Sequence, residues 1–209
     1  ETVSWVIAPR LNAAGRLADA RLVVEMLLTR KLSLAQELAG SLEALNRDRR
    51  AKTEALQNQC EDRLSRDPEL LRQPAVMLDG NGWEPGVLGL VAGSLARLHN
   101  RPAILVAHRT GQASVASARS IEGTDIHSAI ASQANLLLRQ GGHPMAAGFS
   151  IEPAKLGAFR TGLMNWLREH AAAVEPPTLA IDVAQGQGKL SLGMAEETAR
   201  LAPFGAGNP

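Results

Sequence analysis

Residues 75–106, AVMLDGNGWEPGVLGLVAGSLARLHNRPAILV, decide the fold class of this chain. Residues 75–78 form a short apolar run typical of a buried strand, and the turn Asp79-Gly80-Asn81-Gly82 follows it. Helical spacing covers residues 87–98, and a second apolar run occupies residues 103–106. Strand, helix and strand in this order predict an α/β fold with a helix-covered sheet.

The alternation continues towards the C-terminus. We expect a strand of small residues at 114–118, a helix from the capping residue Asp125 to Leu138, and a break at Gly141-Gly142. A further strand at 147–151 and a helix that Pro153 opens, running to about residue 170, complete a mixed sheet with helices. Residues 175–177 are expected to be a linker, and residues 178–183 the first strand of another unit.

Upstream of this sheet the pattern is helical. We expect one helix at residues 17–29 and, after a cap at Ser33 with Gln36 at capping-box spacing, a long helix over residues 34–66. A helix of about 33 residues is roughly 50 Å long. The apolar residues at helical spacing are interrupted at residues 46–53, so the helix is interpreted as a connector between two domains.

Composition narrows the class of protein. The 209 residues carry 22 Lys and Arg against 21 Asp and Glu, a net charge of +1, which argues against binding by bulk electrostatics alone. The single cysteine, Cys60, excludes an internal disulfide framework and a multi-cysteine zinc site. No apolar run approaches membrane-spanning length, so no membrane partner is expected. No initiator Met is present and the last residues are Gly207-Asn208-Pro209, so we expect a piece of a longer protein.

The stretch Gly141-Gly142-His143-Pro144-Met145-Ala146-Ala147-Gly148 is the first candidate binding site. Two glycines after a helix allow a positive φ and a close approach to a ligand, and their N–H groups can form an anion-binding concavity beside an imidazole. The competing interpretation is a glycine helix cap with a surface histidine.

Two arginine motifs are further candidates. Ser117-Ala118-Arg119-Ser120 ends a predicted strand, and an arginine between hydroxyls can bind phosphate through a bidentate fork. Pro9-Arg10-Leu11-Asn12-Ala13-Ala14-Gly15-Arg16 precedes a predicted helix, where an anion is favoured. The alternatives are a solvated arginine for the first motif and a polar turn for the second.

Other polar groups carry less information. In Gly82-Trp83-Glu84-Pro85-Gly86-Val87 the indole can stack on a base, although burial is the commoner fate of such a side chain. The segment 47–50 is interpreted as a solvated helix face, with a nucleic-acid contact as the less favoured alternative. The histidines lack metal-ligand spacing and the aspartates are scattered, so we expect neither catalytic nor metal-binding residues in this chain.

The motifs at residues 9–16, 82–87, 117–120 and 141–148, taken in this order, resemble the RecJ family of single-strand-specific exonucleases in the DHH phosphoesterase superfamily. The tail Pro203-Phe204-Gly205-Ala206-Gly207-Asn208-Pro209 also resembles a motif of that family. The resemblance implies the end of a catalytic DHH domain at residues 1–30 and a connector helix at 31–67. A DHHA1 domain at 68–172 and the start of an oligonucleotide-binding (OB) domain at 177–209 would follow.

The resemblance also implies a function. It makes this chain the substrate-binding portion of a cytoplasmic 5′-to-3′ exonuclease that hydrolyses phosphodiester bonds of single-stranded DNA in repair and recombination. Mn²⁺ or Mg²⁺ would bind upstream of the chain, and a single-strand-binding protein is a candidate partner. The resemblance implies that Ser117 and Arg119 bind the 5′ phosphate. It also implies that Arg10, Asn12 and Arg16 hold the strand near the metals. The adjoining backbone would be contacted by Gly141, Gly142 and His143.

One residue departs from the family pattern, because Glu84 stands where RecJ proteins more often carry a histidine. An acidic side chain there would repel phosphate, which counts against a substrate role for this loop. Two other functions stay open: a phosphodiesterase acting on short oligonucleotides or cyclic dinucleotides, and a catalytically inactive scaffold that binds nucleic acid.

Overall fold

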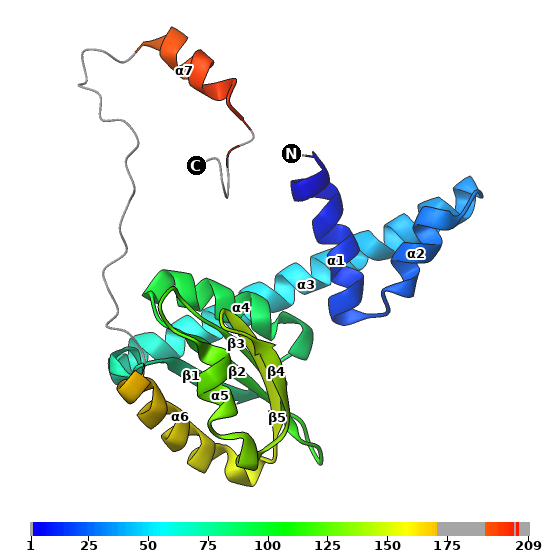
Figure 1. The fold of residues 1–209 in the computed structure, drawn as a ribbon. Helices are drawn as coiled ribbons and strands as arrows, with labels where there is room; N and C mark the ends of the chain where they lie inside the picture. Colours follow the sequence, from blue (N-terminus) through cyan, green and yellow to red (C-terminus); the bar gives the residue numbers. More distant parts are fainter. Residues whose placement is uncertain (1, 171–190, 203, 205–209) are drawn as a thin grey trace.

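The computed structural model describes residues 2–170, 191–202 and 204 (Figure 1). The helices are α1 (Ala8–Leu17), α2 (Arg21–Leu28), α3 (Leu32–Arg66), α4 (Pro85–His99), α5 (Ile126–Ala131), α6 (Leu156–His170) and α7 (Leu192–Ala199). The strands are β1 (Val76–Asn81), β2 (Ala103–His108), β3 (Ser114–Arg119), β4 (Leu137–His143) and β5 (Ala146–Ile151). Within the described ranges, no helix has both the length and the apolar character needed to cross a membrane.

The strands form one mixed sheet in the order β1-β2-β3-β5-β4. β1 and β2 are parallel because α4 crosses between them, and the other neighbouring pairs are antiparallel. The predicted fold class, an α/β sheet covered by helices and preceded by a long helix, is therefore confirmed. The strand expected at 178–183 and most of the expected OB domain lie outside the described residues.

Helices cover both faces of the sheet, as Figure 1 shows. On one face, Val76, Leu78 and Leu105 pack with α4 and with the C-terminal half of α3. On the other face, Ile104 and Phe149 pack with α5 and α6. Alternate residues of each strand supply the two cores, because successive side chains of a strand point to opposite faces.

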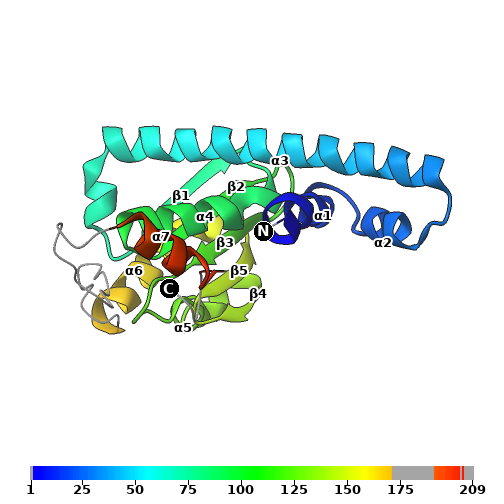
Figure 2. The same cartoon turned by 90° about the horizontal axis from the view of Figure 1, so that it is seen from above.

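Helix α3 is a single element of 35 residues, which confirms the predicted long helix (Figure 2). Its C-terminal half packs on α4 through Leu56, Cys60 and Leu64. Its N-terminal half packs against α1 and α2. The helix begins one residue before Ser33, so the predicted cap is wrong, and Lys31 at the N-cap makes no side-chain cap bond.

The N-terminal motif that was expected to precede a helix is itself helical. Residues 8–17 form α1, and the helix expected at 17–29 is limited to α2 at residues 21–28. Ala13 and Ala14 in α1 are fully buried, and their small side chains suit the close packing of α1 on α3. A proline in the first turn and a single glycine disguise this helix in the sequence.

The largest disagreement concerns residues 125–143. Asp125 caps α5 as predicted, accepting a hydrogen bond from the Ser128 amide at 3.0 Å. The helix ends at Ala131, however; residues 134–136 form a short 3-10 helix, and the last two residues expected in the helix, Leu137 and Leu138, begin β4. β4 is the edge strand beside β5, so its conformation depends on a partner strand rather than on helical spacing.

Candidate nucleic-acid interface

Two rows of residues cross the sheet from β3 to its edge. Arg119 lies opposite Ala146 on β5, which in turn lies opposite His143 on β4. Ser117, Gly148 and Gly141 form the parallel row two residues away. Cross-strand partners point to the same face, so the motifs around Arg119 and His143 share one surface.

This surface is the α4 side of the sheet. Helix α4 packs over β2 and β3. Beyond β3, Ala146 and Gly148 are only half-buried, whereas Ala147 and Phe149, which point to the other face, are buried. The result is a surface of small residues beside Arg119, shallow enough for a sugar–phosphate backbone to approach the sheet.

The glycine pair lies within strand β4, so its interpretation as a helix cap is wrong. Gly142 has φ +149°, and a Cβ there would overlap the carbonyl oxygen of Ala146 and lie 2.5 Å from the Ala147 Cα. Glycine is therefore required for β4 and β5 to pair this closely. The turn between them is fixed by backbone bonds to the Pro144 and Met145 carbonyls, at 3.0 and 2.9 Å.

The side chain of Arg119 lies in the space that Gly89, which has no side chain, leaves free. Its Nη1 donates to the Ala118 carbonyl at 2.8 Å and to the Ser117 Oγ at 3.2 Å. A Cβ on Gly89 of α4 would lie 2.6 Å from Nη2 of Arg119. Burial, and secondly the charge of Arg16, lower the pKa of Arg119.

Arg16 comes from the end of α1 and reaches the same region. Its Nη1 donates to the Gly86 carbonyl at 3.3 Å, and a Cβ on Gly86 would overlap the Arg16 carbonyl oxygen. The end of α1 is thus in direct contact with the start of α4. This contact explains how Arg16 and Arg119, far apart in the sequence, become electrostatic neighbours.

Arg49, from the middle of α3, is a third cation beside Arg16. Burial lowers the pKa of Arg49 first, and the charges of Arg16 and Arg50 lower it further. Within the described residues, no carboxylate forms an ion pair with Arg16, Arg49 or Arg119. We name Arg16, Arg49 and Arg119 the arginine row; no ion pair within the described residues balances its positive charge.

The other predicted residues differ in their surroundings. Arg10 forms an ion pair with Glu43 and donates to the Val6 carbonyl, so its charge is already balanced. Asn12 is exposed and lines, with Arg16, an open groove of about 570 Å³. His143 is exposed on β4.

Trp83 is buried, at 9% exposure, and its Nε1 donates to the Gln59 Oε1 at 3.1 Å. Base stacking by this indole is therefore excluded. Arg49 is not among the predicted site residues, because the favoured interpretation of segment 47–50 is a solvated face and a nucleic-acid contact is the less favoured alternative. The helical period would have placed Arg49 on the same side as Leu42, Asn46 and Leu56, which are buried.

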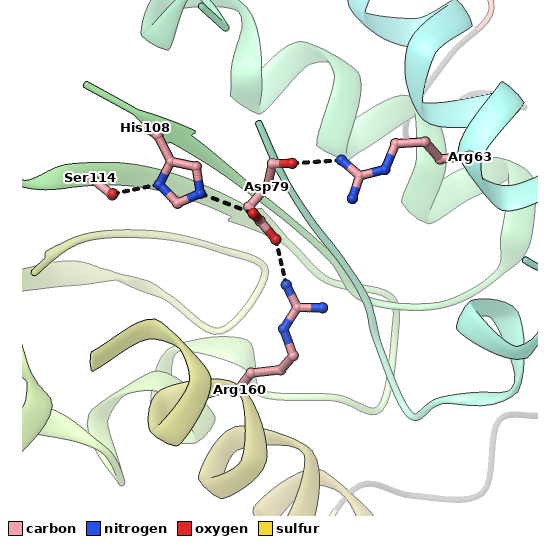
Figure 3. Close-up of polar contacts among 5 residues, drawn as sticks. All are labelled: Arg63, Asp79, His108, Ser114 and Arg160. Carbon is pink, nitrogen blue, oxygen red and sulfur yellow. Dashed lines mark hydrogen bonds and ion pairs between the residues drawn. The ribbon is translucent and has the colours of Figure 1, made fainter. Parts of the chain in front are cut away.

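A second polar cluster lies on the opposite face of the sheet (Figure 3). Asp79 at the end of β1 contacts His108 Nε2 through Oδ2 at 2.9 Å, and its Oδ1 accepts from Arg160 of α6 at 2.6 Å. His108 Nδ1 lies 2.8 Å from the Ser114 Oγ. The sequence predicts Asp79 as a turn residue and shows no metal-ligand spacing of the histidines, so it does not reveal this cluster.

This second cluster is structural. Ser114 is 0% exposed, so its hydroxyl cannot reach a substrate despite the serine–histidine–aspartate order. Arg63 of α3 donates to the Asp79 carbonyl at 2.5 Å, so the cluster joins α3, the sheet and α6. Burial alone raises the pKa of Asp79, but the hydrogen bond from His108 and the charges of Arg160, His108 and Arg63 outweigh it and lower the pKa.

The described part of the chain offers no set of metal ligands. It contains no group of three or more His, Cys, Asp or Glu side chains that could hold a metal ion. The residues described here therefore do not fit a catalytic metal centre, and the chemistry that they support is anion binding.

Comparison with known proteins identifies related sequences and structures. Residues 72–169 match the DHHA1 domain family. Over its whole length the chain is 32% identical to the single-stranded-DNA-specific exonuclease RecJ of Bacillus subtilis, and over 99% of its length it is 36% identical to that of Thermus thermophilus. Along its whole length the chain is therefore similar to RecJ exonucleases. It spans 27% and 29% of the lengths of these two RecJ proteins.

Solved RecJ structures share the fold. The crystal structure of Thermus thermophilus RecJ with Mg²⁺ superimposes with a TM-score of 0.81 at 33% identity, covering 100% of this chain and 32% of that protein. A manganese-bound exonuclease RecJ gives a TM-score of 0.70 at 36% identity, over 80% of this chain and 41% of that one. The domain boundaries expected at residues 30, 67 and 172 stay predictions.

Proposed function

We propose that this chain is the substrate-binding portion of a 5′-to-3′ exonuclease that hydrolyses the phosphodiester bonds of single-stranded DNA. The observation that carries the proposal is the arginine row beside an open, small-residue face of the sheet. Unbalanced guanidinium groups favour a polyanion, and small residues let its backbone approach. The likeness to RecJ proteins along the chain supports the choice of DNA.

Different residues bind different parts of the DNA strand. Ser117 and Arg119 bind the 5′-terminal phosphate through a hydroxyl and a guanidinium fork. Arg16, with Asn12 and Arg10, holds the strand that follows. Gly141 and His143 lie on the same face in the neighbouring rows, with the backbone of Gly142 between them, and this segment contacts the adjoining backbone.

Binding in this way positions a scissile bond without supplying the hydrolytic group. The proposal therefore assigns the divalent cation, Mn²⁺ or Mg²⁺, to residues outside this chain; both ions occur in the RecJ structures that match it. A role in DNA repair and recombination, a cytoplasmic location and cooperation with a single-strand-binding protein belong to the same proposal.

The decisive experiment compares 5′-phosphorylated and 5′-hydroxyl oligonucleotides. In the protein that carries this chain, Arg119→Ala is expected to weaken binding of the phosphorylated strand by about 1.5–3 kcal/mol, the range for losing a charged hydrogen bond. Arg109→Ala is the matched control, because Arg109 is an exposed arginine in the loop between β2 and β3. Equal losses for the two strands with Arg119→Ala would overturn the assignment of a 5′-phosphate pocket.

A second measurement tests the substrate class. Degradation of a long single strand with added Mn²⁺ is expected to proceed from the 5′ end and to exceed degradation of dinucleotides. Preferential hydrolysis of linear or cyclic dinucleotides would favour the phosphodiesterase function instead. Absence of hydrolysis, with binding retained, would leave a nucleic-acid-binding scaffold.

A further inference from the structure

Arg49 carries a buried donor that has no hydrogen-bond partner among the described residues. Its Nε is buried and has no hydrogen-bond partner, and the same holds for the Oδ1 of Asn46, one turn earlier on α3. An unsatisfied buried polar group costs about 1–3 kcal/mol, and more when it is charged. For the Nε donor of Arg49 the missing partner is a hydrogen-bond acceptor, which an anionic ligand can supply.

The surroundings of Arg49 indicate the charge of that acceptor. Arg16 is a close positive neighbour, and Arg50 adds a second positive charge. No carboxylate forms an ion pair with Arg49 in the described part of the chain, although Arg10 on the neighbouring α1 is paired with Glu43. A partly buried guanidinium among cations is stabilised by an anion.

The arrangement of the cations indicates the shape of the anion. Arg16 is the shared neighbour, since its charge acts on both Arg49 and Arg119. Arg16 donates to the Gly86 carbonyl, and Arg119 lies against Gly89, one turn further along α4. Arg49 comes from α3, so the three cations are spread over separate elements.

We propose that Arg49 binds an internal phosphate of the DNA strand, beyond the nucleotides held by Arg119 and Arg16. This rests on the proposed function and deepens it, because it extends the interface onto the long helix α3. It also makes Arg49 a determinant of substrate length. A 5′-phosphorylated dinucleotide has two phosphates and engages Arg119 and Arg16, whereas a longer strand also reaches Arg49.

The test uses Arg49→Gln in the protein that carries this chain, with Arg47→Gln as the control. Arg47 is exposed on the same helix, so the control removes the same charge. Binding is measured by fluorescence anisotropy without added divalent ions, on a 5′-phosphorylated 12-nucleotide strand and on a 5′-phosphorylated dinucleotide. We expect Arg49→Gln to weaken 12-mer binding about tenfold, as for the loss of one charged hydrogen bond. Dinucleotide binding is expected to stay unchanged.

The salt dependence gives an independent readout. Losing one phosphate contact lowers the slope of log affinity against log salt by about 0.7 for single strands. Arg49→Gln is expected to show this decrease, and Arg49→Lys, which keeps the charge, is expected to retain the slope. The melting temperature of Arg49→Gln is expected to be unchanged or raised, since the variant removes a buried charge that repels its neighbours.

Three results would overturn the proposal. One is an Arg49→Gln affinity and salt slope equal to those of Arg47→Gln. Another is an equal loss on the dinucleotide, which would place Arg49 on the same phosphates as Arg119 and Arg16. The third is a large fall in melting temperature with unchanged salt slope, which indicates a structural role. Arg119→Ala is measured in parallel. If the proposed function is wrong, this variant shows no loss that is specific for the 5′ phosphate; if only the role of Arg49 is wrong, it still shows that loss.

Discussion

Replacing Gly89 with alanine would test whether this glycine is needed to place the Arg119 side chain, without lowering the stability of α4. An alanine inside a helix is favoured over glycine by about 0.8–1 kcal/mol. A Cβ at this position would, however, lie 2.6 Å from Nη2 of Arg119 and 2.9 Å from the Ser117 Oγ. The guanidinium is the flexible end of a long side chain, so we expect it to move while the helix stays intact.

The magnitude follows from what the displaced group loses. A charged hydrogen bond contributes about 1.5–3 kcal/mol, so affinity for a 5′-phosphorylated strand is expected to fall by about 10- to 150-fold. Titration of labelled strands with and without the phosphate measures this loss, and thermal unfolding is expected to show no decrease in melting temperature.

Gly93→Ala is the matched control for this experiment. It lies one turn further along α4, and its Cβ would make an ordinary contact of 3.7 Å with the Arg119 Cγ. The same helix preference is gained there without displacing the guanidinium. Equal affinities of Gly89→Ala and Gly93→Ala for the phosphorylated strand would refute the reasoning that the glycine makes room for a phosphate-binding arginine.

Three further predictions concern stability and reactivity. Cys60 is fully buried and burial raises the pKa of its thiol to about 12, so iodoacetamide at pH 8 is expected to label it only after unfolding; mass spectrometry that finds rapid native labelling would contradict this. The pKa of Asp79 is lowered in the folded protein, so its charge stabilises the fold above the unfolded value of about 3.9 and this contribution disappears as pH falls through the folded pKa. Urea unfolding across pH 3–7 is thus expected to show a smaller acid loss for Asp79→Asn, and parallel curves would count against it. Gly142→Ala is expected to lower the free energy of unfolding by about 1–3 kcal/mol, the usual cost of a strained backbone. Gly141→Ala, with open space around its Cβ, should differ little from the natural protein, and similar losses in both variants would argue against the close pairing of β4 and β5.

Local patterns predicted much of this fold. The long helix α3 follows from apolar residues at helical spacing, since the hydrogen bonds of a helix join residues close in the chain. The parallel pair β1 and β2 follows from two apolar runs separated by a helical segment. The cap at Asp125 was also predictable, because a cap acts on the next turn of its own helix.

Edge strand β4 was not predictable in this way. Residues 137–143 contain two glycines and exposed polar side chains, which gives them no clear strand period. They become a strand because β5 offers hydrogen-bonding groups along its free edge. That partner lies beyond a turn whose own position depends on backbone bonds from residues 120 and 126.

The same distinction between local patterns and contacts of distant segments applies to the candidate site. By itself, the sequence determined the residue types that can bind phosphate, the long helix and the resemblance to RecJ proteins. Only the tertiary structure decided that Arg16, Arg49 and Arg119 are neighbours, that Arg10 is neutralised by Glu43, and that Trp83 is buried. The physical reason is that charge balance and burial depend on contacts between distant segments, here the packing of α1 on α3 and α4.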